Sequence, residues 1–247
     1  MKIDAHIKLG DCYTGETYRA DDYLLLMEKH GIDLAIISPY KPLSNDLSEA
    51  NERIAEYIEK FPNKFIGTVR VNPWQREEAL KMAEQWLEKG FKGIHLFPWE
   101  ETFQVNDELV YPLVELAEVR QVPVVIEAGY PIVSHVTKIA DLAYRYPNVK
   151  FYMTNAGQLD LSGDSINDVG YFMELLDNLH MGTSSAVAYM WLASLIKDGK
   201  IGKRIHFESN YPFTDPYMEI YRIETNPITD HEKELVFFRN TKRLFNL

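Results

Sequence analysis

Apolar and polar positions follow two patterns along this chain. Short apolar runs rich in β-branched residues, such as Leu34–Ile37 and Val122–Ile126, are followed by longer segments with the spacing of amphipathic helices. Nearly continuous apolar runs are typical of parallel strands that are buried on both faces. The alternation therefore predicts repeated strand–helix units over a parallel sheet.

Eight runs have the character of such strands, and eight is the strand number of a TIM, or (β/α)8, barrel. We therefore predict an α/β protein with this fold. The predicted strands are Lys2–Ile7, Leu34–Ser38, Phe65–Val71, Gly93–Phe97, Val122–Glu127, Val149–Thr154, Leu179–Ser184 and Arg204–Ser209.

The segments between these strands have the period of helices. In Asp46–Lys60 the first residue is a suitable N-cap, apolar residues recur every three or four positions, and Pro62 follows the end. Glu77–Lys89 has the same period and is followed by Gly90, a usual C-cap residue. Further helices are predicted over Asp107–Arg120, His135–Tyr146, Ile166–Leu176, Ala186–Lys197 and Asp230–Phe245.

Composition adds limits to this picture. The 247 residues suit one barrel, and no linker-like stretch divides them, so we expect a single domain over residues 1–247. A formal net charge of -11 argues against nucleic acid or an anionic membrane as a partner. The partner that we expect is a small-molecule substrate. Cys12 is the only cysteine, so no disulfide can form within the chain. Without a leader or a long apolar run, we expect a cytoplasmic protein.

Six segments carry a family resemblance through their motifs and their order. They are Lys2–Lys8, Gly90–Pro98 (GFKGIHLFP), Pro123–Gly129 (PVVIEAG), Tyr146–Gly157 (YPNVKFYMTNAG), Arg204–Phe213 (RIHFESNYPF) and Asn240–Phe245 (NTKRLF). They resemble the H-x-H strand, GxKGIKLHP, PVxIHxG, YPxxxxxxxHxG, RILFGSDYPF and NAxRLF of the amidohydrolase superfamily. The resemblance is to its amidohydrolase-related branch of metal-dependent hydrolases and decarboxylases, and it implies a TIM barrel.

The resemblance also implies a metal centre at the strand ends, with histidines and an aspartate as ligands. At the matching positions stand His6, Lys8, Glu127, Asn155 and Asn210, so only the first histidine is retained. A protonated lysine is not a metal ligand, and an asparagine amide cannot act as a general base. If a zinc or manganese ion were bound, His6 and Glu127 would be its ligands.

We therefore expect Lys8 and Glu127 to meet where a metal would otherwise lie. Two opposite charges about 4 Å apart attract by roughly 4 kcal/mol at an effective dielectric of about 20. The resulting hypothesis is a centre without a metal, in which His6, Lys8 and Glu127 are catalytic. Lactonases and sugar-lactone isomerases of the same branch, to which this hypothesis is similar, work without a divalent metal.

Four further residues are predicted to bind the substrate: Arg70, His95, Asn155 and Asn210. Tyr130 is another candidate of the same pocket. For three residues a plain alternative stays open. Arg70 could form a structural ion pair, His95 could be a hydrogen-bonded core histidine, and Lys8 could be exposed beyond its strand.

The leading function is an amidohydrolase-like hydrolase that acts on a small carboxylated or lactone-type molecule. Two alternatives remain: a catalytically inactive barrel that serves as a binding module, and a metal-dependent hydrolase or decarboxylase with a reduced metal site. The resemblance further implies a homodimer, because homodimers are common in that family.

Overall fold

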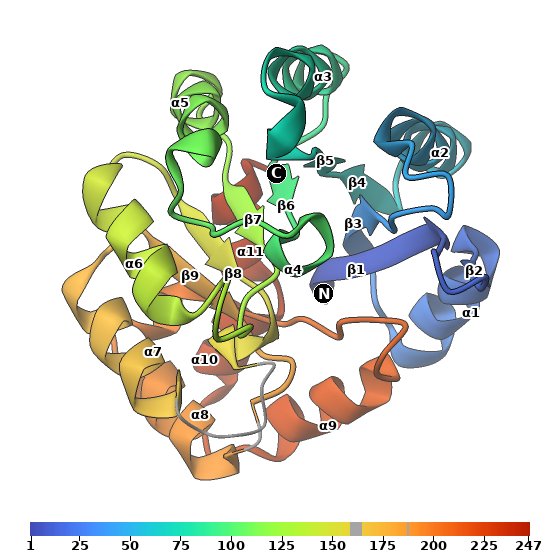
Figure 1. Cartoon of the computed structure of the whole chain (residues 1–247). Coiled ribbons are helices and arrows are strands. Elements are labelled where there is room, and N and C mark those ends of the chain that lie inside the picture. The colour runs from blue at the N-terminus through green and yellow to red at the C-terminus, as the bar shows by residue number, and fades with distance from the viewer. Residues whose placement is uncertain (159–164, 187) are drawn as a thin grey trace.

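The computed structural model describes residues 1–158, 165–186 and 188–247. Its strands lie at the centre of the molecule and its helices surround them (Figure 1). The strands of the ring are β1 (Ile3–Asp11), β3 (Leu34–Pro39), β4 (Phe65–Gly67), β5 (Val69–Arg70), β6 (Ile94–Leu96), β7 (Val124–Ile126), β8 (Phe151–Met153), β9 (Leu179–Gly182) and β10 (Ile205–His206).

Backbone hydrogen bonds join these strands into a closed ring. The strands β1, β3 and β4 pair in parallel, and so do the strands from β5 to β10. The strands β4 and β5 are two halves of the predicted strand Phe65–Val71, interrupted at Thr68. At the other seam, Ala5 N donates to Phe207 O at 2.8 Å and Lys8 N to Tyr211 O at 3.0 Å. Each of the eight predicted strands is present, and the predicted TIM-barrel fold is confirmed.

The helices follow the strands around the outside of the ring. Every predicted helix is present, but Asp107–Arg120 begins as a 3₁₀ turn over Glu108–Val110, and Asp230–Phe245 contains a π turn over Leu235–Arg239. The helices that match predictions are α2 (Leu47–Lys60), α3 (Glu77–Glu88), α5 (Tyr111–Arg120), α6 (Val136–Arg145), α7 (Ser165–Leu175), α8 (Tyr189–Lys197), α10 (Asp230–Glu234) and α11 (Asn240–Phe245).

Within the described residues, three α-helices and one strand were missed by the sequence analysis: α1 (Ala20–His30), α4 (Pro98–Glu101), α9 (Pro216–Thr225) and β2 (Thr17–Tyr18), which is antiparallel to β1. The helices α1 and α9 complete the strand–helix alternation after β1 and β10. Within the described residues, no helix combines the length and the apolar character needed to cross a membrane.

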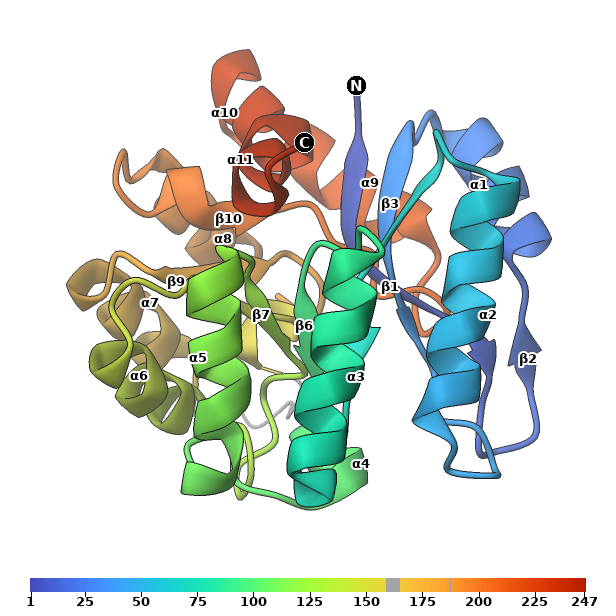
Figure 2. The same ribbon diagram turned by 90° about the horizontal axis from the view of Figure 1, so that it is seen from above.

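The two ends of the barrel differ in character. The termini lie at one end with α10 and α11, whereas α4 and β2 lie at the opposite end (Figure 2). Near the termini, Leu244 and Phe245 of α11 pack with Ala5, Val125 and Tyr152 from inside the ring. This apolar layer fills the floor of the barrel, so the polar side chains of the interior gather toward the end marked by α4.

The first turn of α2 offers a test of the predicted helix start. Asp46 accepts hydrogen bonds from Ser48 N at 2.9 Å and Glu49 N at 3.3 Å, as its predicted N-cap role requires. We expect Asp46→Ala to lower the free energy of unfolding by about 1 kcal/mol, because two backbone donors lose their acceptor. Urea denaturation measures this change. Asp46→Asn keeps an acceptor oxygen, and an equal loss in that variant would contradict the capping role.

Candidate active site

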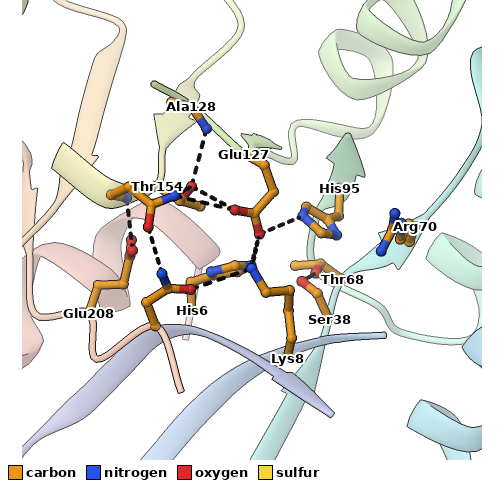
Figure 3. A network of polar contacts seen from close by, with 12 residues as sticks. His6, Lys8, Ser38, Thr68, Arg70, His95, Glu127, Ala128, Thr154 and Glu208 are labelled. Atoms are coloured by element: carbon orange, nitrogen blue, oxygen red, sulfur yellow. Dashed lines mark hydrogen bonds and ion pairs between the residues drawn. The ribbon is translucent and has the colours of Figure 1, made fainter. Parts of the chain in front are cut away.

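Three nitrogen-bearing side chains converge on one oxygen of Glu127 inside the ring (Figure 3). Lys8 Nζ lies 2.7 Å from Glu127 Oε1, His6 Nε2 lies 3.3 Å from it, and His95 Nε2 lies 3.4 Å from it. The lysine and the first histidine come from β1, the second histidine from β6, and the glutamate directly follows β7. All four side chains are at most 1% exposed. The predicted contact of Lys8 with Glu127 is therefore present.

The two asparagines complete a closed loop of hydrogen bonds with this ion pair. Lys8 Nζ also donates to Asn210 Oδ1 at 3.4 Å, and Asn210 Nδ2 donates to Asn155 Oδ1 at 2.6 Å. Asn155 Nδ2 then donates to Glu127 Oε2 at 3.3 Å, and Thr154 Oγ1 donates to the same oxygen at 3.1 Å. The loop thereby fixes the orientation of both amides and occupies both oxygens of the carboxylate.

Burial and charge determine the protonation states at this centre. Burial by itself would raise the pKa of Glu127, but the ammonium of Lys8 holds that pKa well below its usual range. Burial lowers the pKa of His95 to about 4 and the pKa of His6 well below 6.5, against the attraction of the Glu127 carboxylate. The centre thus holds an anionic carboxylate and two neutral imidazoles at neutral pH.

The imidazoles also have unused hydrogen-bonding capacity. Among the described residues, the Nδ1 atoms of His6 and His95 have no hydrogen-bonding partner, and their Nε2 atoms have only the 3.3 and 3.4 Å contacts with Glu127 Oε1. Buried polar atoms of this kind are uncommon, since most find a partner in a folded protein. They are therefore available to a ligand, a water molecule or a metal ion.

Arg70 forms the ion pair that the sequence analysis left open as an alternative. One guanidinium nitrogen, Nη2, lies 2.6 Å from Glu100 Oε2 and 2.6 Å from Glu101 Oε1. The guanidinium also lies 4.9 Å from the centre of the Phe97 ring and apart from the Lys8–Glu127 pair (Figure 3). The contacts with two carboxylates engage Arg70 beside the centre, so a role in substrate binding would require it to change partners.

Aromatic rings surround the ammonium of Lys8. The ring centres of Phe97 and Phe213 lie 5.2 Å from Nζ, and that of Tyr40 lies 5.9 Å from it. Such rings stabilise a cation through their negative faces. Phe213 is 71% exposed although it contacts a buried ammonium, so this side chain borders both solvent and the centre. Tyr130, the other predicted pocket residue, is stacked on Trp99 with ring centres 5.2 Å apart.

Several residues of the interior were missed by the sequence analysis. Ser38 and Thr68 form a buried hydroxyl pair at 2.5 Å, and Thr154 binds the central carboxylate. Glu208 is fully buried, and burial raises its pKa to about 8 although three hydrogen bonds act in the opposite direction. The signal for Glu208 was an acidic residue at the end of an apolar strand, next to the residues already selected.

Three side chains of the centre could hold a metal ion by geometry. One ligand atom from each of His6, His95 and Glu127 lies within 4.8 Å of the other two. His6 and Glu127 were the ligands expected from the sequence if a metal were present, and the structure adds His95. Lys8 competes for this position, because its ammonium already binds the shared carboxylate oxygen at 2.7 Å.

Comparisons with known proteins agree with this architecture. A family model described as amidohydrolase matches residues 3–247. A search of curated protein sequences found no match.

Solved structures share the fold at low sequence identity. An uncharacterised TIM-barrel protein from Bordetella bronchiseptica has a TM-score of 0.79 and 16% identity, over 99% of this chain and 98% of that chain. A 5-carboxyvanillate decarboxylase from Sphingomonas paucimobilis has a TM-score of 0.78 and 16% identity, over 100% and 99%. A 5-carboxyvanillate decarboxylase from Novosphingobium aromaticivorans, complexed with manganese and a nitrobenzoic acid, has a TM-score of 0.78 and 14% identity, over 100% and 96%.

The buried acid Glu208 leads to a prediction about pH. Its pKa is raised from 4.5 to about 8 in the folded chain, so the folded state keeps a proton that the unfolded state has lost between these values. Stability from this group is complete below pH 4.5 and declines as the pH rises toward 8. Relative to Glu208→Gln, the native protein should lose about 1.4 kcal/mol of unfolding free energy per pH unit in this window.

Urea denaturation of both proteins at pH 5, 6.5 and 8 measures the difference. Glu52→Gln, at an exposed position of α2, is the control and should show no such trend. A constant difference between native protein and Glu208→Gln across this range would contradict a raised pKa.

Proposed function

Because this chain belongs to the amidohydrolase family, we propose that it is an enzyme that acts on a small carboxylated or lactone-type molecule. Its centre would be the Lys8–Glu127 pair, working without a divalent metal. The observation that carries this proposal is the 2.7 Å contact between a buried ammonium and a buried carboxylate at the end of the barrel where the strands finish. The solved decarboxylases named above act on a carboxylated compound, which supports the proposed substrate class.

The charges at the centre explain why we propose no metal. A divalent ion held by His6, His95 and Glu127 would lie beside the Lys8 ammonium, which binds the same carboxylate oxygen. At about 4 Å and an effective dielectric of about 20, this repulsion would amount to roughly 8 kcal/mol. Glu127 is the only carboxylate among the three ligands, and it already balances Lys8. The residues therefore do not fit a divalent ion while Lys8 is protonated.

The side chains of the centre could each perform one step in the addition of water to a carbonyl group. The Lys8 ammonium would donate to the carbonyl oxygen and stabilise the negative charge that develops there. A neutral imidazole, His6 or His95, would accept the proton of an attacking water molecule through a ring nitrogen that has no partner among the described residues. Glu127 would hold the Lys8 ammonium in a fixed direction.

A second candidate is a binding module without catalysis. The observation in its favour is that Lys8, His6, His95 and Glu127 expose at most 1% of their side chains. A substrate would have to displace a covering group such as Phe213 to reach Lys8, whereas a structural ion pair would need no access. Turnover, rather than binding, separates the two candidates.

Metal content tests the proposed role of Lys8. We expect protein purified without chelator to contain far less than one zinc or manganese per chain by mass spectrometry. Lys8→His removes the competing cation and adds a nitrogen ligand, so this variant should approach one metal per chain. Lys8→Arg keeps the positive charge and should remain without metal. Stoichiometric metal in the native protein would contradict the proposal.

Turnover tests the proposed role of Glu127. Lactones and esters of small carboxylic acids can be screened by the acid that their hydrolysis releases. With any substrate found in this way, Glu127→Gln should lower kcat at least 100-fold, because Lys8 loses its counter-charge and its fixed direction. Glu52→Gln serves as the matched control. Activity retained in Glu127→Gln would exclude the proposed chemistry.

A further inference from the structure

Glu208 contacts the hydrogen-bonded loop of the centre through the backbone of Asn155. Its Oε1 accepts a hydrogen bond from Asn155 N at 2.9 Å and another from the Ser184 hydroxyl. Its Oε2 accepts from the Tyr152 hydroxyl at 2.5 Å. Among the described residues, no lysine, arginine or histidine forms an ion pair with this carboxyl group. Its partners are therefore neutral donors from two segments, β8 with the turn that follows it and the turn after β9, and one of these donors is the backbone N–H of a residue of the centre.

The neighbouring strand leaves room for this carboxyl group. Gly182 is the last residue of β9, and a Cβ added there would overlap with Glu208 Oε2 and lie 2.6 Å from the Tyr152 hydroxyl. Any larger residue at position 182 would therefore displace Glu208. The glycine at position 182 thus provides the space that this carboxyl group occupies. The motif that Arg204–Phe213 resembles has glycine at the position of Glu208.

The backbone that Glu208 holds has an unusual conformation. Asn155 has a φ of 57°, and the next residue, Ala156, has a φ of 49°. Positive φ is tolerated by asparagine but is rare for alanine, so this turn needs support from its surroundings. The hydrogen bond from Asn155 N to Glu208 stabilises the backbone of this turn. The side chain of Asn155 is held separately, by its hydrogen bonds with Glu127 and Asn210.

From these contacts we infer that Glu208 is a positioning residue. By holding the backbone N–H of Asn155, it keeps that residue in the left-handed conformation that directs its amide at Glu127 and Asn210. Among the described residues, the carboxyl group of Glu208 forms no hydrogen bond or ion pair with Lys8, His6, His95 or Glu127. Its effect on turnover, which rests on the proposed function, would pass through Asn155.

Amide hydrogen exchange, measured by NMR spectroscopy, tests this inference without a substrate. In the native protein the amide of Asn155 should be protected, and exchange at the rate of an unstructured peptide would by itself overturn the inference. Glu208→Met should speed exchange at Asn155 at least tenfold more than at the amides of β7. Glu208→Gln keeps an acceptor oxygen and should stay within threefold of the native rate.

Two further variants separate positioning from plain packing. Gly182→Ala leaves Glu208 in the chain but takes its space, so it should also expose the amide of Asn155. Glu219→Met removes another buried glutamate, from α9, that makes no described contact with Asn155. This variant should leave the exchange rate at Asn155 unchanged relative to the rates at the amides of β7. An equal rise at Asn155 in Glu208→Met and Glu219→Met would show a general loss of packing and overturn the inference.

Kinetics provide a second measurement once a substrate is known. Glu208→Met should lower kcat at least tenfold with KM within threefold, and Glu208→Gln should restore most of that loss. If Glu127→Gln left turnover intact, the proposed chemistry would fail while the exchange result at Asn155 could still stand. Normal kcat in Glu208→Met, together with a loosened Asn155, would show that the position of Asn155 does not matter for turnover and would overturn the catalytic part of the inference.

Discussion

The buried ion pair between Lys8 and Glu127 is the constraint on which the interior of this barrel depends. Either charge alone would be costly to bury, and the loss of one partner from such a pair usually costs several kcal/mol. Together they are neutral, and at 2.7 Å each satisfies the other. Asn210 then accepts a further ammonium hydrogen, and Asn155 donates to the second carboxylate oxygen. The two amides thus complete the solvation that water would otherwise give the pair.

This pair can form only because the barrel closes. Lys8 comes from β1 and Glu127 follows β7, so they are far apart in sequence and reach each other across the interior. The backbone of Lys8 is fixed at the seam of the ring, where its N–H donates to Tyr211 O. The same segment carries Asn210, which binds the ammonium of Lys8. The segment after β10 that contains Asn210 and Tyr211 therefore both closes the ring and accepts a hydrogen bond from the Lys8 ammonium.

The sequence predicted much of this arrangement from two sources. Buried parallel strands are continuously apolar, which located the strands, and the family resemblance placed His6, Lys8, Glu127 and Asn155 together at the carboxyl ends of those strands. The helices α1 and α9 were missed, since each follows a loop whose length the strand pattern does not set. Arg70 could not be assigned for a similar reason. Its partners, Glu100 and Glu101, lie in the short helix α4, which was itself missed.

The charge balance at the centre links several positions at once. An aspartate at position 210, as in the motif that this segment resembles, would place a second carboxylate beside Lys8 and leave the centre with a net negative charge. A histidine at position 8 would instead remove the cation and leave Glu127 without its counter-charge. Neither change alone keeps the interior neutral, because each leaves one negative charge without a counter-charge. In the centre that we propose, the ammonium of Lys8 would take the electrostatic place of a metal ion, and the neutral amide of Asn210 would leave Glu127 as its single counter-charge.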